Sequence, residues 1–67
     1  MEFTLNDEYI ELYKLIKVMD LVDSGAEAKE LVAQAQVRRN GQIEVRKRAK
    51  IRSGEVIKIA DVTIDIK

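Results

Sequence analysis

The sequence contains no cysteine and no histidine among its 67 residues. Without cysteine the chain cannot form disulfides, thiolate metal sites or redox centres at sulfur. Without histidine it lacks the commonest metal ligand and general base of proteins. Carboxylates alone can bind a metal ion, but no acidic run has the spacing of a calcium loop. The sequence therefore predicts neither a metal ion nor a cofactor, and it suits a reducing, cytoplasmic environment.

Aromatic residues and long apolar segments are also scarce. The chain has two tyrosines and one phenylalanine, with no tryptophan and no proline. No apolar run is long enough to span a bilayer, and the start lacks the basic-then-apolar pattern of a signal peptide. The length allows one domain with a small core, in which a deep active-site cleft is hard to build. Because no paired carboxylates or nucleophile–base set is recognisable, we expect a non-enzymatic domain without a small-molecule substrate. We further expect residues 1–67 to form one soluble, monomeric domain without a membrane partner.

The charge of the chain is zero in total but very unevenly placed. Residues 1–34 carry eight acids and three lysines, whereas residues 35–58 carry eight cations and two acids. The densest part is the basic stretch, residues 37–54, in which seven cations face a single acid, Glu44. Such asymmetry favours a polyanion as partner. Self-association of the acidic and basic faces, or solvated charge that protects sheet edges, are the less favoured alternatives.

Two amphipathic segments predict helices over residues 8–19 and 25–35. In the first, apolar residues follow helical spacing and Asn6 or Asp7 is placed to cap. In the second, Ser24 and Glu27 fit a capping box. The expected buried positions are Tyr9, Leu12, Leu15, Ile16, Val18 and Met19 in the first helix, and Ala28, Leu31, Val32 and Ala35 in the second. Tyr13 is expected to pack at the border of the first helix.

Alternating residues after the second helix predict a β-hairpin that bends at Asn40-Gly41. A two-residue turn would pair Val37 with Glu44, which mixes core and solvent positions. A three-residue loop over residues 39–41 pairs Val37 with Ile43 instead and gives Gly41 a left-handed bulge position. We therefore expect the longer loop, with Arg39 projecting from its tip and with Val37, Ile43 and Val45 on one buried face.

Further alternation predicts short strands at residues 2–5, 56–59 and 62–66. The last two have opposite parity, so a bend or bulge is expected near Ala60-Asp61, and the last strand is expected to pair with residues 3–5. Residues 46–50 are too charged for the interior and are expected to cross the surface. The resulting fold class is α+β, with two helices packed on a small, mostly antiparallel sheet of about four to five short strands.

Three motifs occur in order: Ser24-Gly25-x-x-Ala28-Lys29-x-Leu31-Val32, Val37-x-x-Asn40-Gly41 and Ile51-x-x-Gly54-Glu55-x-Ile57. Over about residues 9–59 this set resembles the S-four-type RNA-binding domain, also called the alpha-L motif. That domain occurs in a small-subunit ribosomal protein, pseudouridine synthases, tyrosyl-tRNA synthetases and a heat-shock ribosome-binding protein. The short free-standing members of the YaaA/YbcJ type look most similar. The resemblance implies the alpha-L RNA-binding fold and a structured RNA partner, ribosomal RNA or tRNA, with the ribosome as a candidate assembly.

The resemblance also implies where RNA lies, namely across the start of the second helix and the surface of the basic hairpin. Ala35 stands where a helix-ending glycine is usual in the family, which predicts a different helix end with Gln36 in the turn. Carried over by position, the implied RNA-binding residues are Ser24, Gly25 and Lys29 on the helix side, and Arg38, Arg39, Asn40, Arg46, Lys47, Arg48 and Lys50 on the hairpin side.

The sequence therefore predicts an RNA-binding module that grips the phosphate backbone of structured RNA. Arg and Lys neutralise phosphates and release counterions, which accounts for affinity without base reading. With few aromatic residues for stacking, recognition of splayed bases is not expected. The alternative is a protein-interaction module that docks its basic face on an acidic partner and does not bind RNA.

Overall fold

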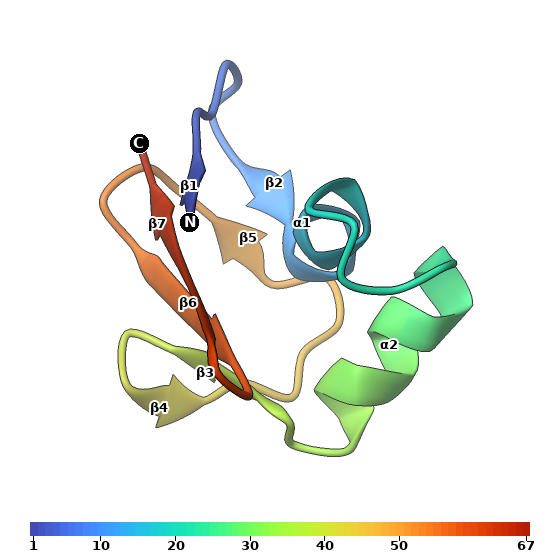
Figure 1. Cartoon of the computed structure of the whole chain (residues 1–67). Coiled ribbons are helices and arrows are strands. Elements are labelled where there is room, and N and C mark those ends of the chain that lie inside the picture. The colour runs from blue at the N-terminus through green and yellow to red at the C-terminus, as the bar shows by residue number, and fades with distance from the viewer.

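Two helices and seven short strands make up the structure, a computed structural model that describes all 67 residues. A five-stranded sheet has the order β1-β7-β6-β3-β4, in which only the β1–β7 pair is parallel. Strands β2 and β5 form a separate antiparallel pair, and both helices stand on one side of the larger sheet (Figure 1). The elements are β1 Glu2–Phe3, β2 Ile10–Glu11, α1 Leu12–Val18, α2 Gly25–Ala33, β3 Val37–Arg39, β4 Gln42–Ile43, β5 Lys50–Ile51, β6 Val56–Ile59 and β7 Val62–Ile66.

This arrangement confirms the predicted fold class of two helices on a mostly antiparallel sheet. The larger sheet has five strands, the upper end of the predicted range, and the separate β2–β5 pair was not predicted. The predicted pairing of the last strand with the first is also confirmed, since Glu2 and Phe3 lie beside Asp65 and Ile66. Neither helix has the length and apolar composition needed to cross a membrane.

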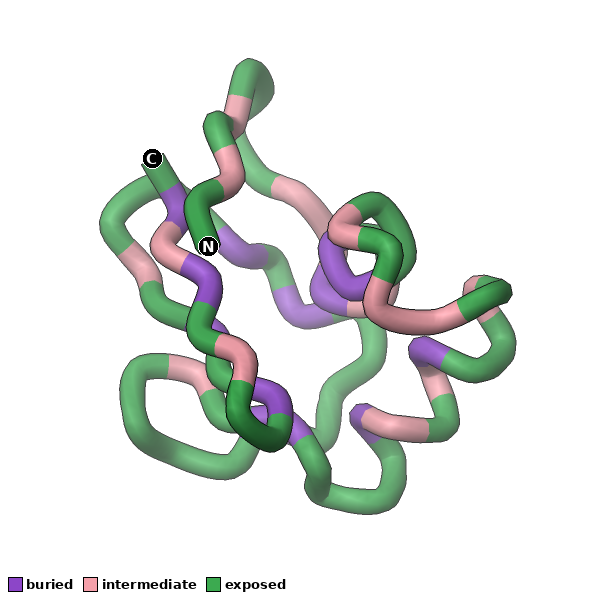
Figure 2. The backbone as a smooth tube through the Cα atoms, in the orientation of Figure 1, coloured by how far each residue is buried: buried purple, intermediate pink, exposed green.

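The core lies between the helices and the face of the large sheet that is turned toward them (Figure 2). The two-residue connection at Ala60-Asp61 pairs Ile59 with Val62 and Ile57 with Ile64, so residues of opposite parity share one face. A tight turn thus absorbs the phase change for which a bend or bulge was expected. The buried apolar residues are Leu12, Leu15, Ile16, Ala28, Val32, Val37, Ala49, Ile51, Ile57, Ile59, Ile64 and Ile66.

Helix α1 begins four residues later than predicted, at Leu12, and neither Asn6 nor Asp7 caps it. The preceding residues pair as β2 with β5, where Ile10 lies opposite Ile51. The helix start is satisfied by the basic stretch instead, because the amides of Leu12 and Tyr13 donate to the carbonyls of Ala49 and Lys47 at 2.9 and 3.0 Å. The expected core face is correspondingly shorter: Tyr9 and Val18 are 38% and 60% exposed.

Helix α2 begins as predicted. The Ser24 hydroxyl accepts from the Glu27 amide at 3.2 Å, and the Glu27 carboxylate accepts from the amide of Asp23, not Ser24. The helix ends at Ala33, two residues early, and Ala35 is exposed and takes the left-handed conformation itself with φ of 60°. Its amide donates to Val32, and the next amide donates to Leu31, which is the hydrogen-bond pattern of a glycine-ended helix. The expectation that Ala35 excludes this helix end is wrong.

The β3–β4 hairpin has a two-residue turn, so the predicted three-residue loop is wrong. Arg39 pairs with Gln42 and Arg38 with Ile43, while the Glu44 amide donates to the Val37 carbonyl at 2.9 Å. Asn40 and Gly41 have φ of 53° and 87°, both left-handed, as the tight turn that matches strand twist requires. In this register Ile43 and Val45 are 53% and 55% exposed, and Glu44 is buried in their place.

Candidate nucleic-acid interface

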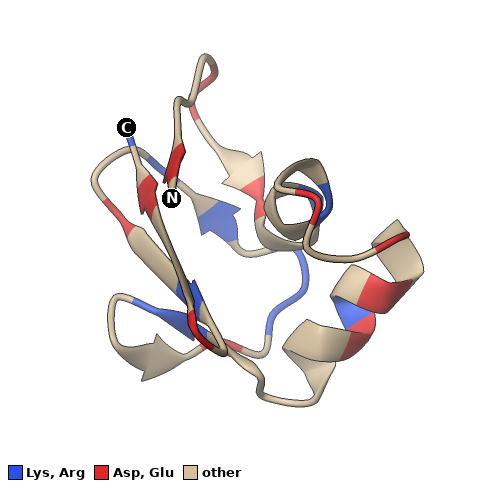
Figure 3. Ribbon diagram, viewed as in Figure 1, with Lys and Arg blue, Asp and Glu red and all other residues tan.

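The cations between β4 and β6 lie on the loop before β5, on β5 and on the segment after it (Figure 3). We call Arg46, Arg48, Lys50 and Arg52 the basic face, because together with Arg39 they line one surface depression. Strand β5 positions Lys50, and the exposed segments on either side of β5 carry the others. Lys47 lies in the same exposed segment. No carboxylate lines this depression, so it presents a concentrated positive potential to solvent.

Arg39 lies beneath the basic face and does not project from the hairpin tip. Its Nε and Nη2 donate to the Glu55 carboxylate at 2.6 and 3.1 Å, and Nη2 also donates to the Lys50 carbonyl at 2.9 Å. Nη1 reaches Glu44 at 3.3 Å. The hydrogen bond from Arg39 holds the pKa of the Glu55 carboxyl below its usual range. The guanidinium thus ties β3 to the turn before β6 and has little capacity left for a ligand.

Asn40 has a comparable structural role. Its amide nitrogen donates to Glu55 at 3.1 Å, and its amide oxygen accepts from the Val56 backbone at 2.9 Å. Glu55 also accepts from the Arg52 backbone amide at 2.7 Å. These contacts fix the turn that carries Arg52 relative to the hairpin.

Arg46 is held by Glu44 but remains largely accessible. Its Nε and Nη2 donate to the Glu44 carboxylate at 3.1 and 3.2 Å, while 74% of its side chain is exposed. Hydrogen bonding from Arg46 lowers the pKa of the Glu44 carboxyl to about 2. The buried carboxylate therefore stays ionised and orients the arginine at the rim of the depression.

Tyr13 joins the basic face to the start of α2. The Lys29 ammonium lies 4.6 Å from the centre of its ring, and the Arg48 guanidinium lies 5.8 Å from it. A Cβ on Gly25 would lie 3.8 Å from the same ring. The structure thus brings together three predicted site residues, Gly25, Lys29 and Arg48, around an aromatic ring that stabilises cations. Ser24 adjoins them as the helix cap.

Arg38 is the one predicted cation that the structure places elsewhere. Successive side chains of a strand point to opposite faces, and Arg39 lies on the core side of β3. Arg38 therefore faces away from the helices, opposite Lys58 of β6. It does not contribute to the basic face.

Two residues next to the predicted set were missed, Arg52 and Tyr9. Arg52 lies in the depression, and the Lys50-Ile51-Arg52 alternation around a buried Ile51 already indicated that it shares a face with Lys50. Tyr9 is exposed and has the Lys50 ammonium 5.1 Å from its ring centre. No sequence signal indicated this, because Tyr9 fitted the periodicity of the first helix.

Comparison with known proteins identifies the family. A family model of the S4 domain matches residues 3–67. The chain belongs to the S4 domain family. This confirms the resemblance on which the site residues were carried over. YbcJ of Escherichia coli (strain K12) is 36% identical over 58 residues, which are 87% of this S4 domain and 83% of YbcJ, and YbcJ of Shigella flexneri matches equally well.

Solved structures agree with the family. The solution structure of E. coli YbcJ superposes with a TM-score of 0.75 at 35% identity, covering 97% of this S4 domain and 84% of YbcJ. YbcJ was described there as having an alpha-L motif involved in RNA binding. The 30S ribosomal protein S4e from Thermoplasma acidophilum has a TM-score of 0.70 at 24% identity, covering 87% of this S4 domain and 31% of S4e. This second likeness shows the fold alone.

Proposed function

We propose that this S4 domain is a non-catalytic module that binds structured RNA by its backbone phosphates, in the cytoplasm and as a monomer. The observation that carries the proposal is the gathering of Arg46, Arg48, Lys50 and Arg52 around one depression without a carboxylate in its lining. Family membership and the description of YbcJ support RNA over other polyanions.

The start of α2 forms the second wall of the proposed interface. Lys29 and Arg48 both contact the Tyr13 ring, which connects this wall to the basic face. The backbone amides of Gly25 and Ala26 donate to no protein acceptor and are available to an anion. The proposed contacts are Ser24, Gly25 and Lys29 on this wall and Arg46, Lys47, Arg48, Lys50 and Arg52 on the other. Arg39 and Asn40 support the interface without touching RNA.

The chemistry of the interface favours RNA shape over base sequence. Arginine forks bind phosphate oxygens in pairs, and lysines add point charges. Tyr9 and Tyr13 are the only aromatic rings beside these cations. Recognition of several unstacked bases would need more stacking surface. Folded ribosomal RNA or tRNA, with the ribosome as the assembly, fits this character.

Paired charge reversals test the proposal. We expect Arg48→Glu with Lys50→Glu to weaken binding to an rRNA hairpin or tRNA at least tenfold, measured by fluorescence anisotropy at fixed salt. The control is Lys67→Glu with Thr4→Glu and Asn6→Asp, which lowers the net charge by the same amount at exposed residues outside both walls of the interface. Equal losses in the variant and the control would show that only net charge matters and would overturn the interface. Retained RNA binding with loss of an acidic protein partner would favour the protein-interaction alternative.

A further inference from the structure

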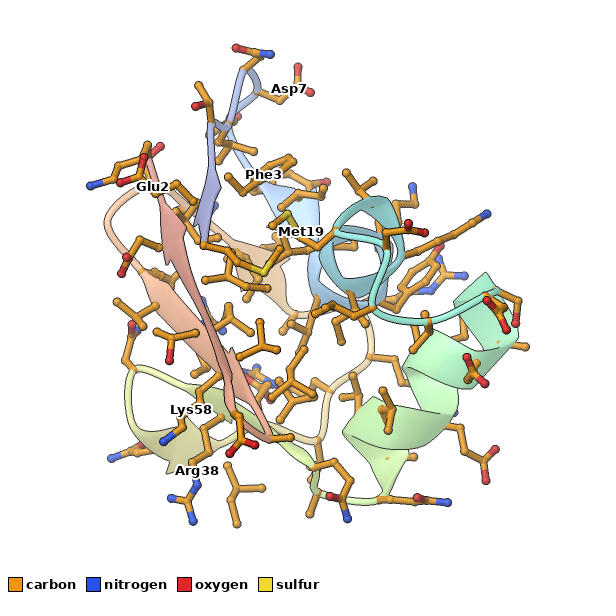
Figure 4. The ribbon with its side chains drawn as sticks, viewed as in Figure 1. Glu2, Phe3, Asp7, Met19, Arg38 and Lys58 are labelled. Carbon is orange, nitrogen blue, oxygen red and sulfur yellow. The ribbon has the colours of Figure 1, made fainter.

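Arg38 and Lys58 form a second cationic site on the far side of the large sheet. They lie directly opposite each other on the neighbouring antiparallel strands β3 and β6. Figure 4 shows the two side chains next to each other, on the side of the sheet away from the helices. Arg39 and the basic face lie on the other side of β3, so the two cationic sites are separated by the sheet itself.

Neither cation of this pair has a carboxylate partner. The one hydrogen bond of the Arg38 side chain runs from Nη1 to the Gly41 carbonyl at 3.3 Å, and Lys58 forms no ion pair. Asp65 and Glu2 share this face, but Asp65 lies in the next row of side chains and Glu2 pairs with Lys67 at 3.8 Å. A third acid, Asp61, is exposed in the turn after Ala60 and forms no ion pair with Arg38 or Lys58. Like charges directly opposite each other on a sheet repel, so folding alone does not favour this pair.

The surroundings of the pair fit an anion. A surface depression next to it is lined by Ala35, Gln36, Arg38, Lys58 and Ala60, with no acid among them. Thr63, which lies opposite Lys58 on β7, adds an exposed hydroxyl to the same row. An arginine fork, an ammonium, an amide and a hydroxyl are all donors of the kinds that bind phosphate oxygens.

We propose that Arg38 and Lys58 bind a backbone phosphate of a second RNA segment, so that this S4 domain joins two RNA segments on opposite faces. The inference rests on the proposed function of the basic face. A straight duplex that lies on the basic face cannot also reach the far side of the sheet. The outer site therefore takes either a separate RNA molecule or a distant segment of the same folded RNA.

A two-RNA capture assay tests this inference. An rRNA hairpin fixed sparsely to beads is loaded with the protein and washed, and capture of a second, fluorescent hairpin is measured. We expect the wild-type protein to capture the second RNA and Arg38→Gln with Lys58→Gln to reduce this capture at least tenfold. The same variant should bind a single hairpin within about twofold of wild type, since the basic face is intact.

Matched variants make the outcomes distinct. Lys58→Arg keeps the charge and should retain capture, and the double glutamine variant should be at least as stable as wild type because it removes a repulsion. Capture that is unchanged in the glutamine variant would overturn the outer site, as would a wild-type protein that binds one hairpin but never a second. Absence of any RNA binding by wild type would instead contradict the proposed function.

Discussion

Arg39 and Arg48 are arginines of the same basic stretch, yet the structure gives them different surroundings. The Arg39 side chain is 24% exposed and donates to Glu55, Glu44 and the Lys50 carbonyl. The Arg48 side chain is 68% exposed, and its nearest carboxylate oxygen, on Glu11, is 4.0 Å away. Charge alone therefore does not identify a ligand contact, because a guanidinium whose donors are occupied by protein acceptors has little to offer a phosphate.

The first prediction compares these two arginines by substitution to methionine. Arg39→Met should lower the free energy of unfolding by about 2 kcal/mol, because it leaves the poorly solvated Glu55 carboxylate without its cationic partner and removes one of the two arginines that bind Glu44. Arg48→Met should change stability little and weaken RNA binding severalfold. Urea denaturation and fluorescence anisotropy on both variants measure the two effects. The assignment of Arg39 is contradicted if Arg39→Met remains fully stable and loses RNA binding.

The second prediction concerns acid stability at Glu44. Its pKa is about 2 in the folded chain, chiefly because of the hydrogen bond from Arg46, and lies below that of an unfolded glutamate. A lowered folded-state pKa stabilises the fold above the unfolded pKa, and this contribution is lost as pH falls from about 5 to about 2. Urea unfolding at a series of pH values should show this loss, and Glu44→Gln should flatten the dependence over the same range. An unchanged slope in the variant would rule out Glu44 as its source.

Among the elements, the end of α2 is locally strained. Ala35 has φ of 60°, a region in which an L-residue with a Cβ is disfavoured and glycine is not. The same conformation at Asp20 ends α1, where the amides of Asp20 and Leu21 donate to Lys17 and Ile16. Both helices thus end with the hydrogen-bond pattern usual for a terminal glycine, although neither has a glycine there. The backbone hydrogen bonds of the helix end hold Asp20 and Ala35 in the left-handed conformation despite the Cβ of each residue.

The third prediction follows from this strain. Ala35→Gly should raise the free energy of unfolding by about 0.5–1 kcal/mol, because relief of the left-handed strain exceeds the added entropy of the unfolded chain. Ala33→Gly, two residues earlier and inside the helix, is the matched control and should lower stability by a similar amount, about 0.5–1 kcal/mol. Urea midpoints of the two variants should therefore move in opposite directions. Movement in the same direction would contradict the assigned conformation of Ala35.

Across the whole molecule, the cations of the basic stretch are divided between two faces of the sheet. The basic face and the Arg38–Lys58 pair lie on opposite sides of β3, while the acids are spread over α2, the loops and the strand edges (Figure 3). With zero net charge the chain gains no general attraction to a polyanion, so binding depends on local potential.

The fourth prediction is the salt dependence of RNA binding. If Lys29, Lys47, Arg48, Lys50 and Arg52 supply four or five phosphate contacts, the slope of log K against log salt should be about −3 to −4.5. The Arg48→Glu, Lys50→Glu variant should reduce the magnitude of this slope by about 2. Anisotropy titrations at four salt concentrations measure both slopes. A wild-type slope near zero would exclude phosphate contacts as the source of affinity.

The sequence by itself determined the features that depend on near neighbours along the chain. Ser24 caps α2 because its partner is three residues away, and the alternation of apolar residues after Val56 places Ile57 and Ile59 in the core. The motif order was sufficient to identify the family, and the density of cations in the basic stretch indicated where the exposed cations of the basic face lie. Each capping, strand or charge signal lies within a few residues, and each family motif is a short local segment.

Tertiary structure decided which of those cations remain free. A shift of one residue in strand register moves every side chain to the opposite face of the sheet. The register of the β3–β4 hairpin depended on a turn whose two residues are both left-handed, and on the contact of Arg39 with Glu55, sixteen residues away. The same register buried Glu44, exposed Ile43, and sent Arg38 to the far side of the sheet. Pairing of Ile10 with Ile51 likewise moved the start of α1. These contacts join distant parts of the chain, so local pattern and periodicity carry no signal for them.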